Sequence, residues 1–520
     1  MRKLWHFHGG LKLDGHKALS MQSPISRAPI PQRLTLPLQQ HIGEPAQPVV
    51  EVGERVLTGQ VIARAEGYIS APVHASSSGT VIAIEKRAIA HPSNIHDTCI
   101  VIETDGQDEW VTSHETRQDY LQMEASELRN RIRDAGIVGL GGAGFPSFIK
   151  LNPGTQQVDT LIINGAECEP YITCDAMLMA ERPREILDGL LIMRHALNAR
   201  QCLIGIEDTK PDAIRALQDA LTPEESQFIE VVTVPTRYPA GGEKQLIRTL
   251  TGQEVPSNGL PIHIGIVCHN VGTAVAIARA IHYSEPLISR IVTLTGQAIA
   301  QPMNVEVRIG TAMQDLLEHA GLDTAKLARL LMGGPMMGFI IENPDVPVIK
   351  TTNCLLAMAR TEVAQEVPAM PCIRCGECTR VCPAKLLPQQ LYWYARSREF
   401  DRVEAYHLFD CIECGCCAVV CPSHIPLVQY YRFAKSEIWA KDREKQKADI
   451  ARERHEFHQL RLERKKREDE DRKRKKKEML EKAARGNDDK QAAIRAAMER
   501  VNAKKAAQQQ SAASNKDTSA

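Results

Sequence analysis

Aromatic side chains, excess charge and long apolar runs are all scarce in this sequence of 520 residues. Only 4% of the residues are aromatic although 43% are hydrophobic, so the cores must be built mainly from aliphatic side chains. Lysine plus arginine and aspartate plus glutamate both number 64, and this balance gives no indication of nucleic-acid binding. The longest uncharged window, residues 255–278, contains Pro256, Pro261 and several polar side chains, which favours strand, turn and helix over a membrane span.

Cysteine, in contrast, is abundant and patterned. Eight of the 15 cysteines form two runs, at 372–382 and 411–421, with the spacing of bacterial iron–sulfur proteins and a proline after each run. Zinc would need only four ligands, and disulfides at this spacing would be strained, so we predict two [4Fe–4S] clusters. The fourth cysteine of each run is expected to bind the other cluster. The predicted ligand sets are therefore Cys372, Cys375, Cys378 and Cys421 for one cluster, and Cys411, Cys414, Cys417 and Cys382 for the other.

Seven further cysteines are scattered along the chain, which suits free thiols in a reducing compartment. Cys416 is the one ambiguous case, because it lies inside the second run. Choosing Cys417 as the ligand reproduces the spacing of the first run, so Cys416 is not expected to bind iron.

The N-terminal hundred residues read as β-structure, with short alternating segments that break at Gly53 and Gly59. Their phrases "VGERVLTGQVIA" and "APVHASSSGTV" resemble the folded-over β-barrel of biotinyl and lipoyl carrier domains. Those carriers present a modifiable lysine on a hairpin. The corresponding region here, residues 64–68, has no lysine, so we expect the scaffold without a swinging cofactor arm.

The remaining segments predict a multidomain chain that combines α/β, β and α parts. Short apolar strands alternate with helices between residues 125 and 285, which is the α/β pattern. One long helix is expected at 387–406, between the two cysteine runs, and residues 508–520 are expected to be disordered. The predicted parts are a lipoyl/biotinyl-carrier-like β domain (1–120), an α/β domain (121–285), a β-grasp-like module (286–350), an α-helical ferredoxin domain with two clusters (365–432) and a charged helical or disordered tail (433–520).

Four polar, glycine-bearing phrases in the α/β segment indicate a second site. The loop Gly139–Gly144 can approach a phosphate with its backbone N–H groups, and Lys150 can add a positive charge. Glu167 and Glu169 directly follow a strand, where carboxylates commonly face a ligand, although capping of a helix N-terminus is the structural alternative. The other two phrases, at 238–244 and 269–273, are also polar turns at strand ends.

In this order, the four phrases resemble the flavin-binding fold of the NADH-oxidising subunit of respiratory complex I. The resemblance implies that FMN is held by Gly139, Gly141, Gly142 and Lys150, and that its isoalloxazine side is lined by Asn164, Glu167, Tyr238, Gly241, Glu243, Asn270 and Thr273. Phe145 would be the place where a nicotinamide or adenine ring stacks. The chain departs from that family at Leu140, Ala166, Cys168 and Gly242, which replace an arginine, an aspartate, a serine and a glutamate.

The chain as far as about residue 435 also resembles the C subunit of the Rnf/Rsx ion-translocating oxidoreductase complex of bacteria. Matching phrases include "FHGG", "GLGGAGFPSFIKL", "INGAECEPYIT", "MGGPMMGF" and "CIRCGECTRVCPAKLLPQQLYW". The resemblance implies a peripheral subunit on the cytoplasmic side of the inner membrane. It would pass electrons between NADH and a ferredoxin-like partner while integral subunits of the same complex move Na⁺ or H⁺.

This interpretation assigns no catalytic residue to the chain, no nucleic acid and no ion pathway of its own. Two alternatives remain open from the sequence. One is a soluble flavin and iron–sulfur subunit of a cytosolic dehydrogenase or hydrogenase. The other is a scaffold whose clusters are structural and whose flavin pocket is empty, which the four departures from the complex I family would favour.

Overall fold

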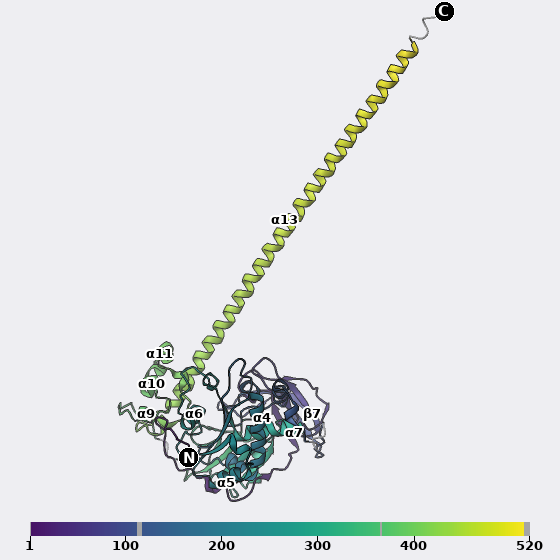
Figure 1. Cartoon of the computed structure of the whole chain (residues 1–520). Coiled ribbons are helices and arrows are strands. Elements are labelled where there is room, and N and C mark those ends of the chain that lie inside the picture. The colour runs from purple at the N-terminus through teal and green to yellow at the C-terminus, as the bar shows by residue number, and fades with distance from the viewer. Residues whose placement is uncertain (1, 112–116, 364–366, 514–520) are drawn as a thin grey trace, which may run out of the picture. The chain divides into compact units, whose positions relative to one another are not determined.

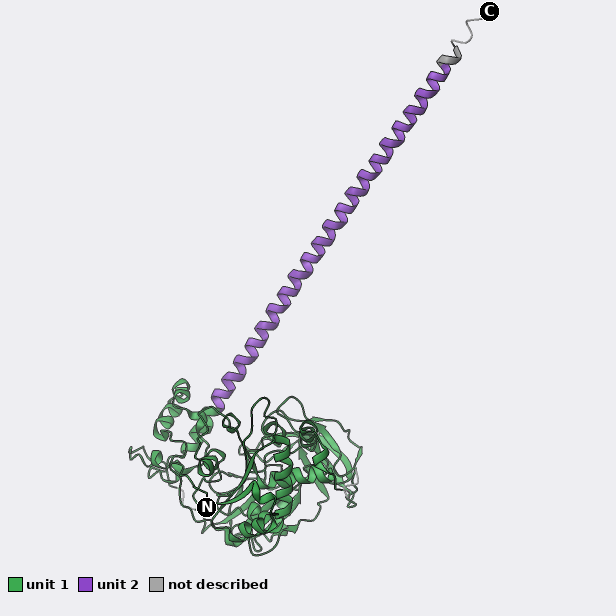
Figure 2. Cartoon of the chain, in the orientation of Figure 1, with its two compact units in different colours: residues 1–435 green, residues 436–520 purple. Residues whose placement is uncertain are grey.

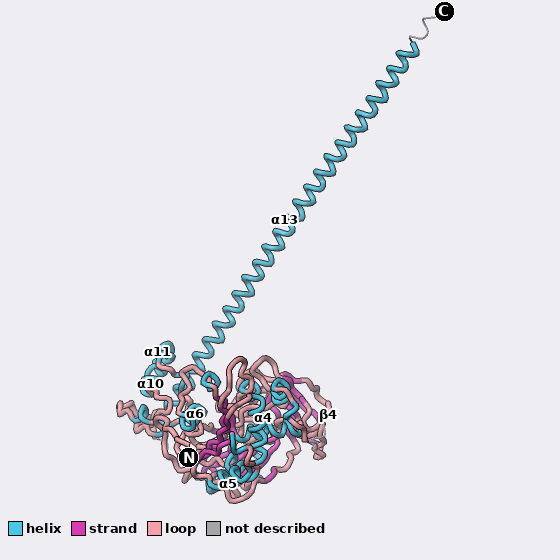
Figure 3. Tube along the Cα trace, viewed as in Figure 1, coloured by secondary structure: helices cyan, strands magenta, loops and turns pink. Residues whose placement is uncertain are grey.

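The computed structural model describes residues 2–111, 117–363 and 367–513. The chain divides into two compact units, residues 1–435 and residues 436–520 (Figures 1 and 2). All of the described strands lie in the first unit, as the secondary-structure colours in Figure 3 show, and the second unit is helical.

The N-terminal domain is a small barrel built from two antiparallel sheets. Their strand orders are β2-β8-β7-β4 and β3-β5-β6. The strands are β2 (Arg33–Pro37), β3 (Gln47–Pro48), β4 (Arg55–Val56), β5 (Val61–Arg64), β6 (Val73–His74), β7 (Gly79–Ala88) and β8 (His96–Thr104). Leu34 pairs with Ile102 and Leu36 with Ile100, and all four side chains are fully buried, so alternate residues of β2 and β8 form the core. The predicted β-scaffold is confirmed.

A four-stranded parallel sheet follows, in the order β11-β10-β9-β12. Its strands are β9 (Thr160–Gly165), β10 (Gln201–Glu207), β11 (Ile229–Val234) and β12 (Ile266–Asn270), and its helices are α1 (Ala125–Asp134), α2 (Ser147–Lys150), α3 (Cys174–Glu181), α4 (Pro183–Leu197), α5 (Pro211–Ala220), α6 (Glu243–Thr251) and α7 (Val271–Tyr283). Leu161 and Ile163 of β9 share a core with α4 and α7, whereas Ile162 packs with Leu246 of α6. The sheet is therefore covered on both faces, as predicted for an α/β domain.

The β-grasp-like module contains a six-stranded sheet in the order β1-β14-β13-β17-β15-β16. Its elements are β1 (Ser26–Arg27), β13 (Ser289–Thr295), β14 (Met303–Arg308), β15 (Leu327–Met332), β16 (Phe339–Ile340), β17 (Cys354–Ala359) and helix α8 (Met313–His319). The predicted limits of 286 and 350 are too narrow for this sheet, because β1 pairs with β14 and β17 lies between β13 and β15. The polar residues around β1 and the short apolar segment of β17 did not indicate these long-range pairings.

The cluster domain repeats one backbone pattern twice. Its helices are α9 (Glu377–Arg380), α10 (Pro388–Ser397), α11 (Phe400–Ala405), α12 (Cys416–Val419) and the first turns of α13 (Leu427–Ala513). Gly376 and Gly415 have φ values of 82° and 78° and precede the equivalent short helices α9 and α12. The single helix predicted at 387–406 is wrong: Arg398, with φ of 59°, ends α10, and its N–H bonds to the Ala395 carbonyl. A left-handed residue of this kind terminates a helix.

The first residues of the chain form an extended segment, here called the strap (residues 2–13), that crosses the first unit. Arg2 forms an ion pair with Glu230 at 2.8 Å, and the Trp5 N–H bonds to the Thr249 carbonyl. Further along, Gly10 and Leu11 bond to the cluster domain and to the loop after β11. The strap therefore contacts both the α/β domain and the cluster domain.

A buried lysine joins three parts of the first unit. Lys350 lies in the loop before β17, and its Nζ donates to the Pro72 carbonyl of the barrel at 2.8 Å and to the Gly136 carbonyl of the α/β domain at 2.7 Å. Burial lowers the pKa of Lys350 to about 7. These contacts fix the barrel, the α/β domain and the β-grasp-like module against one another.

The second unit is the continuation of α13 from Ser436. Its charged residues form exposed ion pairs one turn apart, such as Arg464 with Glu468 and Arg474 with Asp471, both at 2.9 Å. Disorder from residue 508 was predicted. The helix extends to Ala513 instead, because no proline or glycine interrupts it there, and residues 514–520 lie outside the described part. No helix among the described residues is long and apolar enough to span a membrane.

Candidate flavin and iron–sulfur sites

The glycine loop lies at the carboxyl edge of the parallel sheet, between β12 and α2. The Gly139 N–H bonds to the Phe145 carbonyl at 2.7 Å, and the Leu140 N–H bonds to the Thr273 hydroxyl on α7 at 2.9 Å. Gly142 has φ of 111°, and a Cβ placed there would meet nothing within 4 Å. The loop therefore has open space beside Gly142, and its conformation there suits glycine.

Lys150 projects from α2 toward the same edge. Its Nζ lies 2.7 Å from Oε1 of Glu243 and 3.1 Å from the Cys268 carbonyl. Neighbouring His269 is only 4% exposed, and its Nε2 has no hydrogen-bond partner among the described residues. Burial and the charge of Lys150 lower the pKa of His269 to about 3, so the ring is neutral. A buried ring nitrogen without a partner beside an ammonium group fits a site that receives a polar ligand.

Two more of the predicted residues, Asn164 and Asn270, hold this edge together through side-chain hydrogen bonds. Asn164 at the end of β9 donates to the Gly241 carbonyl at 2.8 Å. Asn270 caps α7 with Oδ1 and donates with Nδ2 to Oδ2 of Asp175 at 2.6 Å. Burial and the neighbouring Glu167 carboxylate raise the pKa of Asp175 to about 7. Asp175 was not among the predicted site residues, because in the sequence it is only an acidic residue in the first turn of a helix.

The carboxylates of Glu167 and Glu169 are occupied by backbone groups. Glu167 accepts the N–H groups of Asp175 and Ala176 at the start of α3, at 2.6 and 3.3 Å. Glu169 accepts the N–H groups of Met336 and Met337 at 2.7 and 3.0 Å, and burial raises its pKa. The first arrangement is the helix capping that the sequence left as an alternative. The assignment of Glu167 to the flavin remains a prediction.

The loop that carries these glutamates is fixed from two sides by lysines. Lys17, just after the strap, donates to the carbonyls of Glu167, Glu169 and Ile172 at 2.8, 3.0 and 2.6 Å. Lys210 forms a buried ion pair with Glu207 at 3.0 Å and also bonds to the Ala166 carbonyl. Neither lysine was predicted, since nothing near them in the sequence indicates which loop they reach.

Tyr238, in the turn after β11, extends from this edge to the second cysteine run. It is 3% exposed, and its hydroxyl donates to the Cys414 carbonyl at 2.7 Å. Its backbone pairs with Leu11 of the strap in both directions. The residue assigned to the flavin side by resemblance is thus also a contact between the α/β domain and the cluster domain.

Four of the predicted iron ligands surround a small cavity, called here the inner cluster site: Cys382, Cys411, Cys414 and Cys417. Apolar side chains complete its lining, among them Leu391, Ile412 and Val428, together with Tyr431. This is one of the two crossed ligand sets, and thiols gathered in an apolar cavity fit a [4Fe–4S] cluster. Cys416 is fully buried but does not line the cavity; it packs with Tyr238 instead.

The other ligand set, called here the outer cluster site, consists of Cys372, Cys375, Cys378 and Cys421 and lies nearer the surface. Cys375 is exposed and the other three are partly exposed. The segments of Cys372 and Cys421 are joined by the Met370 N–H to Ser423 carbonyl bond and by the Ser423 hydroxyl to Pro371 carbonyl bond, both 2.9 Å. The start of the first run therefore lies beside the end of the second run. This arrangement fits crossed ligation at the outer cluster site as well.

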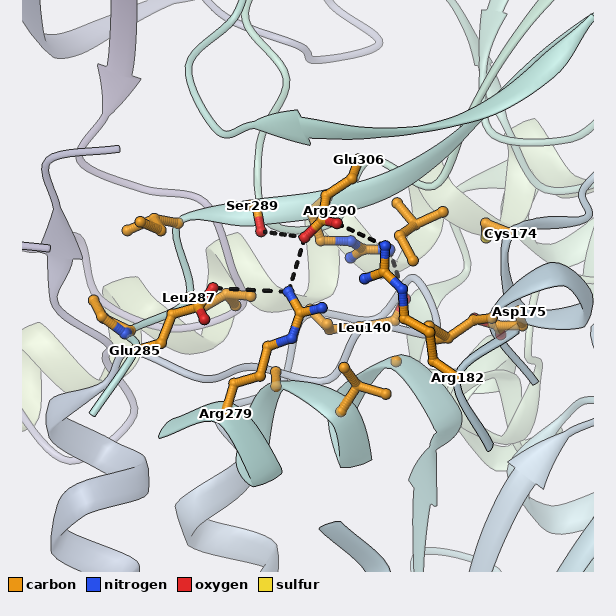
Figure 4. Close-up of a pocket in the computed structure, with 17 residues that line it drawn as sticks. Leu140, Cys174, Asp175, Arg182, Arg279, Glu285, Leu287, Ser289, Arg290 and Glu306 are labelled. Atoms are coloured by element: carbon orange, nitrogen blue, oxygen red, sulfur yellow. Dashed lines mark hydrogen bonds and ion pairs between the residues drawn. The ribbon is translucent and has the colours of Figure 1, made fainter. Parts of the chain in front are cut away.

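A charged cavity of about 60 Å³ lies behind the glycine loop (Figure 4). Arg182 and Arg279 each approach Glu306 to 2.8 Å, and although burial alone would raise the pKa of Glu306, the two guanidinium groups hold it at about 2. Arg290 donates to the Leu140 carbonyl at 3.2 Å. The space admits only a few waters, and its charges neutralise one another, so it serves as an interface between the α/β domain and the β-grasp-like module.

Comparison with protein families matches four models in this order: the RnfC barrel sandwich hybrid domain at residues 5–107, the Nuo51 FMN-binding domain at 132–279, the SLBB domain at 291–340 and the 4Fe-4S dicluster domain at 371–425. The ranges agree with the barrel, the α/β domain, the β-grasp-like module and the cluster domain described above. The chain therefore contains an FMN-binding type of domain and a domain for two [4Fe–4S] clusters.

Curated relatives match over most of the chain. The C subunit of the ion-translocating oxidoreductase complex of Pseudomonas aeruginosa is 50% identical over 89% of this chain and 60% of its own length. The proteins of the same name from Edwardsiella ictaluri and from Yersinia pestis are 47% and 48% identical, over 97% and 89% of this chain and 62% and 74% of their own lengths. The chain thus spans about 60% of the length of the first two relatives.

Proposed function

Because the chain belongs to the family of C subunits of ion-translocating oxidoreductase complexes, we propose that it carries electrons between a flavin site and two [4Fe–4S] clusters within such a complex. The observation that supports this most strongly is the contact between the turn 238–244 at the sheet edge and the inner cluster site, made by the Tyr238 hydroxyl and the Cys414 carbonyl. The activity of the complete complex, including ion translocation, would belong to partner subunits.

We propose FMN as the flavin and NADH as its electron partner. Gly139, Gly141, Gly142 and Lys150 would hold the phosphate and the ribityl chain, and Asn164, Tyr238, Gly241, Asn270 and Thr273 would surround the ring side. Glu167 and Glu243 would act mainly by orienting their partners, the start of α3 and Lys150. Phe145 is half-buried beside the loop, where a nicotinamide or adenine ring could stack. When bound, a flavin exchanges two electrons with a nicotinamide and single electrons with a cluster.

The proposed partners are the integral and peripheral subunits of the same complex, with a ferredoxin-like carrier on the electron path. The proposed location is the cytoplasmic side of the inner membrane, held there by the other subunits. Both proposals rest on family membership and on the relatives' being subunits of an ion-translocating oxidoreductase complex.

Anaerobically purified protein tests the proposal directly. We expect bound FMN, about eight irons and about eight sulfides per chain, and bleaching of the cluster absorbance after addition of NADH. A structural scaffold would show clusters that dithionite reduces but NADH does not. A subunit of a cytosolic dehydrogenase or hydrogenase would remain in the soluble fraction when membranes are washed gently.

The flavin site has its own test, the variant Lys150→Ala. Removing the ammonium group should weaken FMN binding by about ten- to a hundred-fold, the usual loss for a hydrogen bond to a charged group. Lys86→Ala, which removes an exposed lysine on β7, is the control and should leave FMN binding unchanged. Equal FMN affinity in both variants would place the phosphate elsewhere.

A further inference from the structure

Two sets of contacts, which have no role in the site described so far, join the inner cluster site to the carboxyl edge of the parallel sheet, here called the flavin edge. We propose that Tyr238 and the glycines of the strap are positioning residues that connect the flavin site to the cluster bound by Cys382, Cys411, Cys414 and Cys417, which makes this cluster the first to exchange electrons with the flavin. This inference rests on the proposed function, because it requires a flavin at the sheet edge.

The first connection runs through the side chain of Tyr238. The residue follows β11 and lies two positions before Ala240 and three before Gly241, whose carbonyl holds Asn164 of the flavin edge. Its ring packs in a small apolar cluster with Cys414 and Cys416, and its hydroxyl donates to the Cys414 carbonyl at 2.7 Å. The predicted iron ligand Cys414 is therefore joined by one hydrogen bond to Tyr238, which lies in the turn 238–244 at the flavin edge.

The second connection runs through the backbone of the strap. Leu11 and Tyr238 exchange two hydrogen bonds, of 2.7 and 2.8 Å, and the Gly10 N–H bonds to the Val381 carbonyl at 2.9 Å. Val381 directly precedes the ligand Cys382. The strap thus inserts between the two domains and bonds to both.

Only glycine fits at this point of the strap. Gly9 and Gly10 have φ values of 68° and 80°, where other residues are strained. A Cβ on Gly9 would lie 2.5 Å from the Val381 carbonyl carbon, and one on Gly10 would lie 2.6 Å from the Tyr238 carbonyl oxygen. The two glycines let the three backbone segments approach closely enough for both sets of hydrogen bonds.

These contacts indicate the order in which the two clusters would exchange electrons with the flavin. Electrons cross between fixed centres one at a time, and close, rigid packing between the centres favours the transfer. Tyr238 would hold the two sites against each other without itself being oxidised or reduced; a bound flavin would supply single electrons, and a cluster held by the inner site would accept them. The outer cluster site, with exposed Cys375, would then exchange electrons with a partner at the surface.

The variant Tyr238→Phe tests the side-chain connection. It keeps the ring and removes the hydroxyl, so iron content and reduction by dithionite should be unchanged, while reduction of the clusters by NADH, measured with FMN at saturation, slows several-fold. Tyr171→Phe is the control, because the Tyr171 hydroxyl bonds to Glu362 at 2.9 Å and not to the cluster domain. An unchanged NADH rate in Tyr238→Phe at saturating FMN would overturn the inference.

The variant Gly10→Ala tests the strap without any electron transfer, in iron-loaded protein free of flavin. We expect faster amide hydrogen exchange at residues 378–386 and 236–240, because the methyl group pushes the strap from its two partners. Gly106→Ala is the control: its φ of 71° imposes similar backbone strain, but no atom lies within 4 Å of the added Cβ. Equal exchange in both variants would overturn the positioning role of the strap even if FMN binding is confirmed.

The order of the clusters is tested by removing one at a time. In Cys411→Ala, NADH should no longer reduce the remaining cluster, although dithionite still does. In Cys375→Ala, NADH should reduce the remaining cluster at the wild-type rate. The opposite pair of results would reverse the proposed order, whereas a wild-type protein that binds no FMN would refute the proposed function instead.

Discussion

The two cysteine runs have the same spacing and the same backbone turns, but they lie in different surroundings. Gly376 and Gly415 adopt nearly the same positive φ before equivalent helices. The inner site, however, is buried against the α/β domain and the strap, whereas the outer site exposes Cys375. The comparison teaches that cysteine spacing determines which cluster is bound, while the neighbouring domains determine what each cluster can exchange electrons with.

Removing one ligand from each site should give the largest contrast. Cys411→Ala and Cys375→Ala should each lose about four of about eight irons. Cys411→Ala should also lose much more thermal stability than Cys375→Ala, because loss of the inner cluster leaves a cavity lined by apolar side chains at a domain contact. Iron analysis and thermal unfolding measure both effects. Equal losses of stability would show that the inner site is not more tightly integrated than the outer site.

Within the second run, Cys416 and Cys417 provide a comparison between adjacent cysteines. Cys417 lines the inner cavity, so Cys417→Ser should lower the iron content by up to half. Cys416 packs beside Tyr238 outside the cavity, so Cys416→Ser should leave the iron content unchanged. Iron and sulfide analysis of both variants, purified side by side, would detect an exchange of these roles.

Exposure to an iron chelator should separate the two sites in time. The outer cluster should be lost first, because solvent reaches Cys375 directly, and the inner cluster should persist until the domain contact opens. We expect two phases in the cluster absorbance, with the faster one missing in Cys375→Ala. A single phase in the wild-type protein would mean that the sites open together.

The smallest contrast concerns two hydroxyl groups that support the sites. Tyr431 beside the inner site donates to the Pro388 carbonyl at 2.7 Å, and Tyr431→Phe should cost about 1–3 kcal/mol because that carbonyl stays buried without a partner. Ser423 supports the outer site through Pro371, whose surface is exposed to water, so Ser423→Ala should cost about 0.5–1.5 kcal/mol. Urea-dependent loss of cluster absorbance compares the two variants.

The sequence predicted the cluster ligands and the edge of the sheet because both are local patterns. Cysteines at fixed spacing and polar residues after strands can be recognised within about ten positions. The phrases that contain Asn164 and Gly241 were recognised as polar segments at strand ends, and the two residues are joined by a hydrogen bond in the fold. The break at Arg398 was missed, because arginine rarely adopts the left-handed conformation that ends α10.

Long-range contacts account for most of what the sequence could not predict. The phrase around Gly9 and Gly10 gave no indication of its role, because Val381 and Tyr238 lie hundreds of positions away. Glu167 was assigned to the flavin by resemblance, while in the fold its carboxylate caps α3. Lys17, whose ammonium group donates to three carbonyl groups of the same loop and lies 3.8 Å from the Glu167 carboxylate, carries no local signal at all.

The strap also has a consequence for the order in which the protein is synthesised and completed. Gly10 and Val381 are 371 positions apart, so at about 5–20 residues per second the ribosome adds the partner of Gly10 roughly 20–70 seconds after Gly10 itself. The Gly10 N–H therefore lacks its Val381 partner until the first cysteine run has been made, whereas Leu11 can pair with Tyr238 earlier. Closure of the strap then becomes one of the last steps of maturation, and premature pairing of this segment would leave the cluster domain undocked.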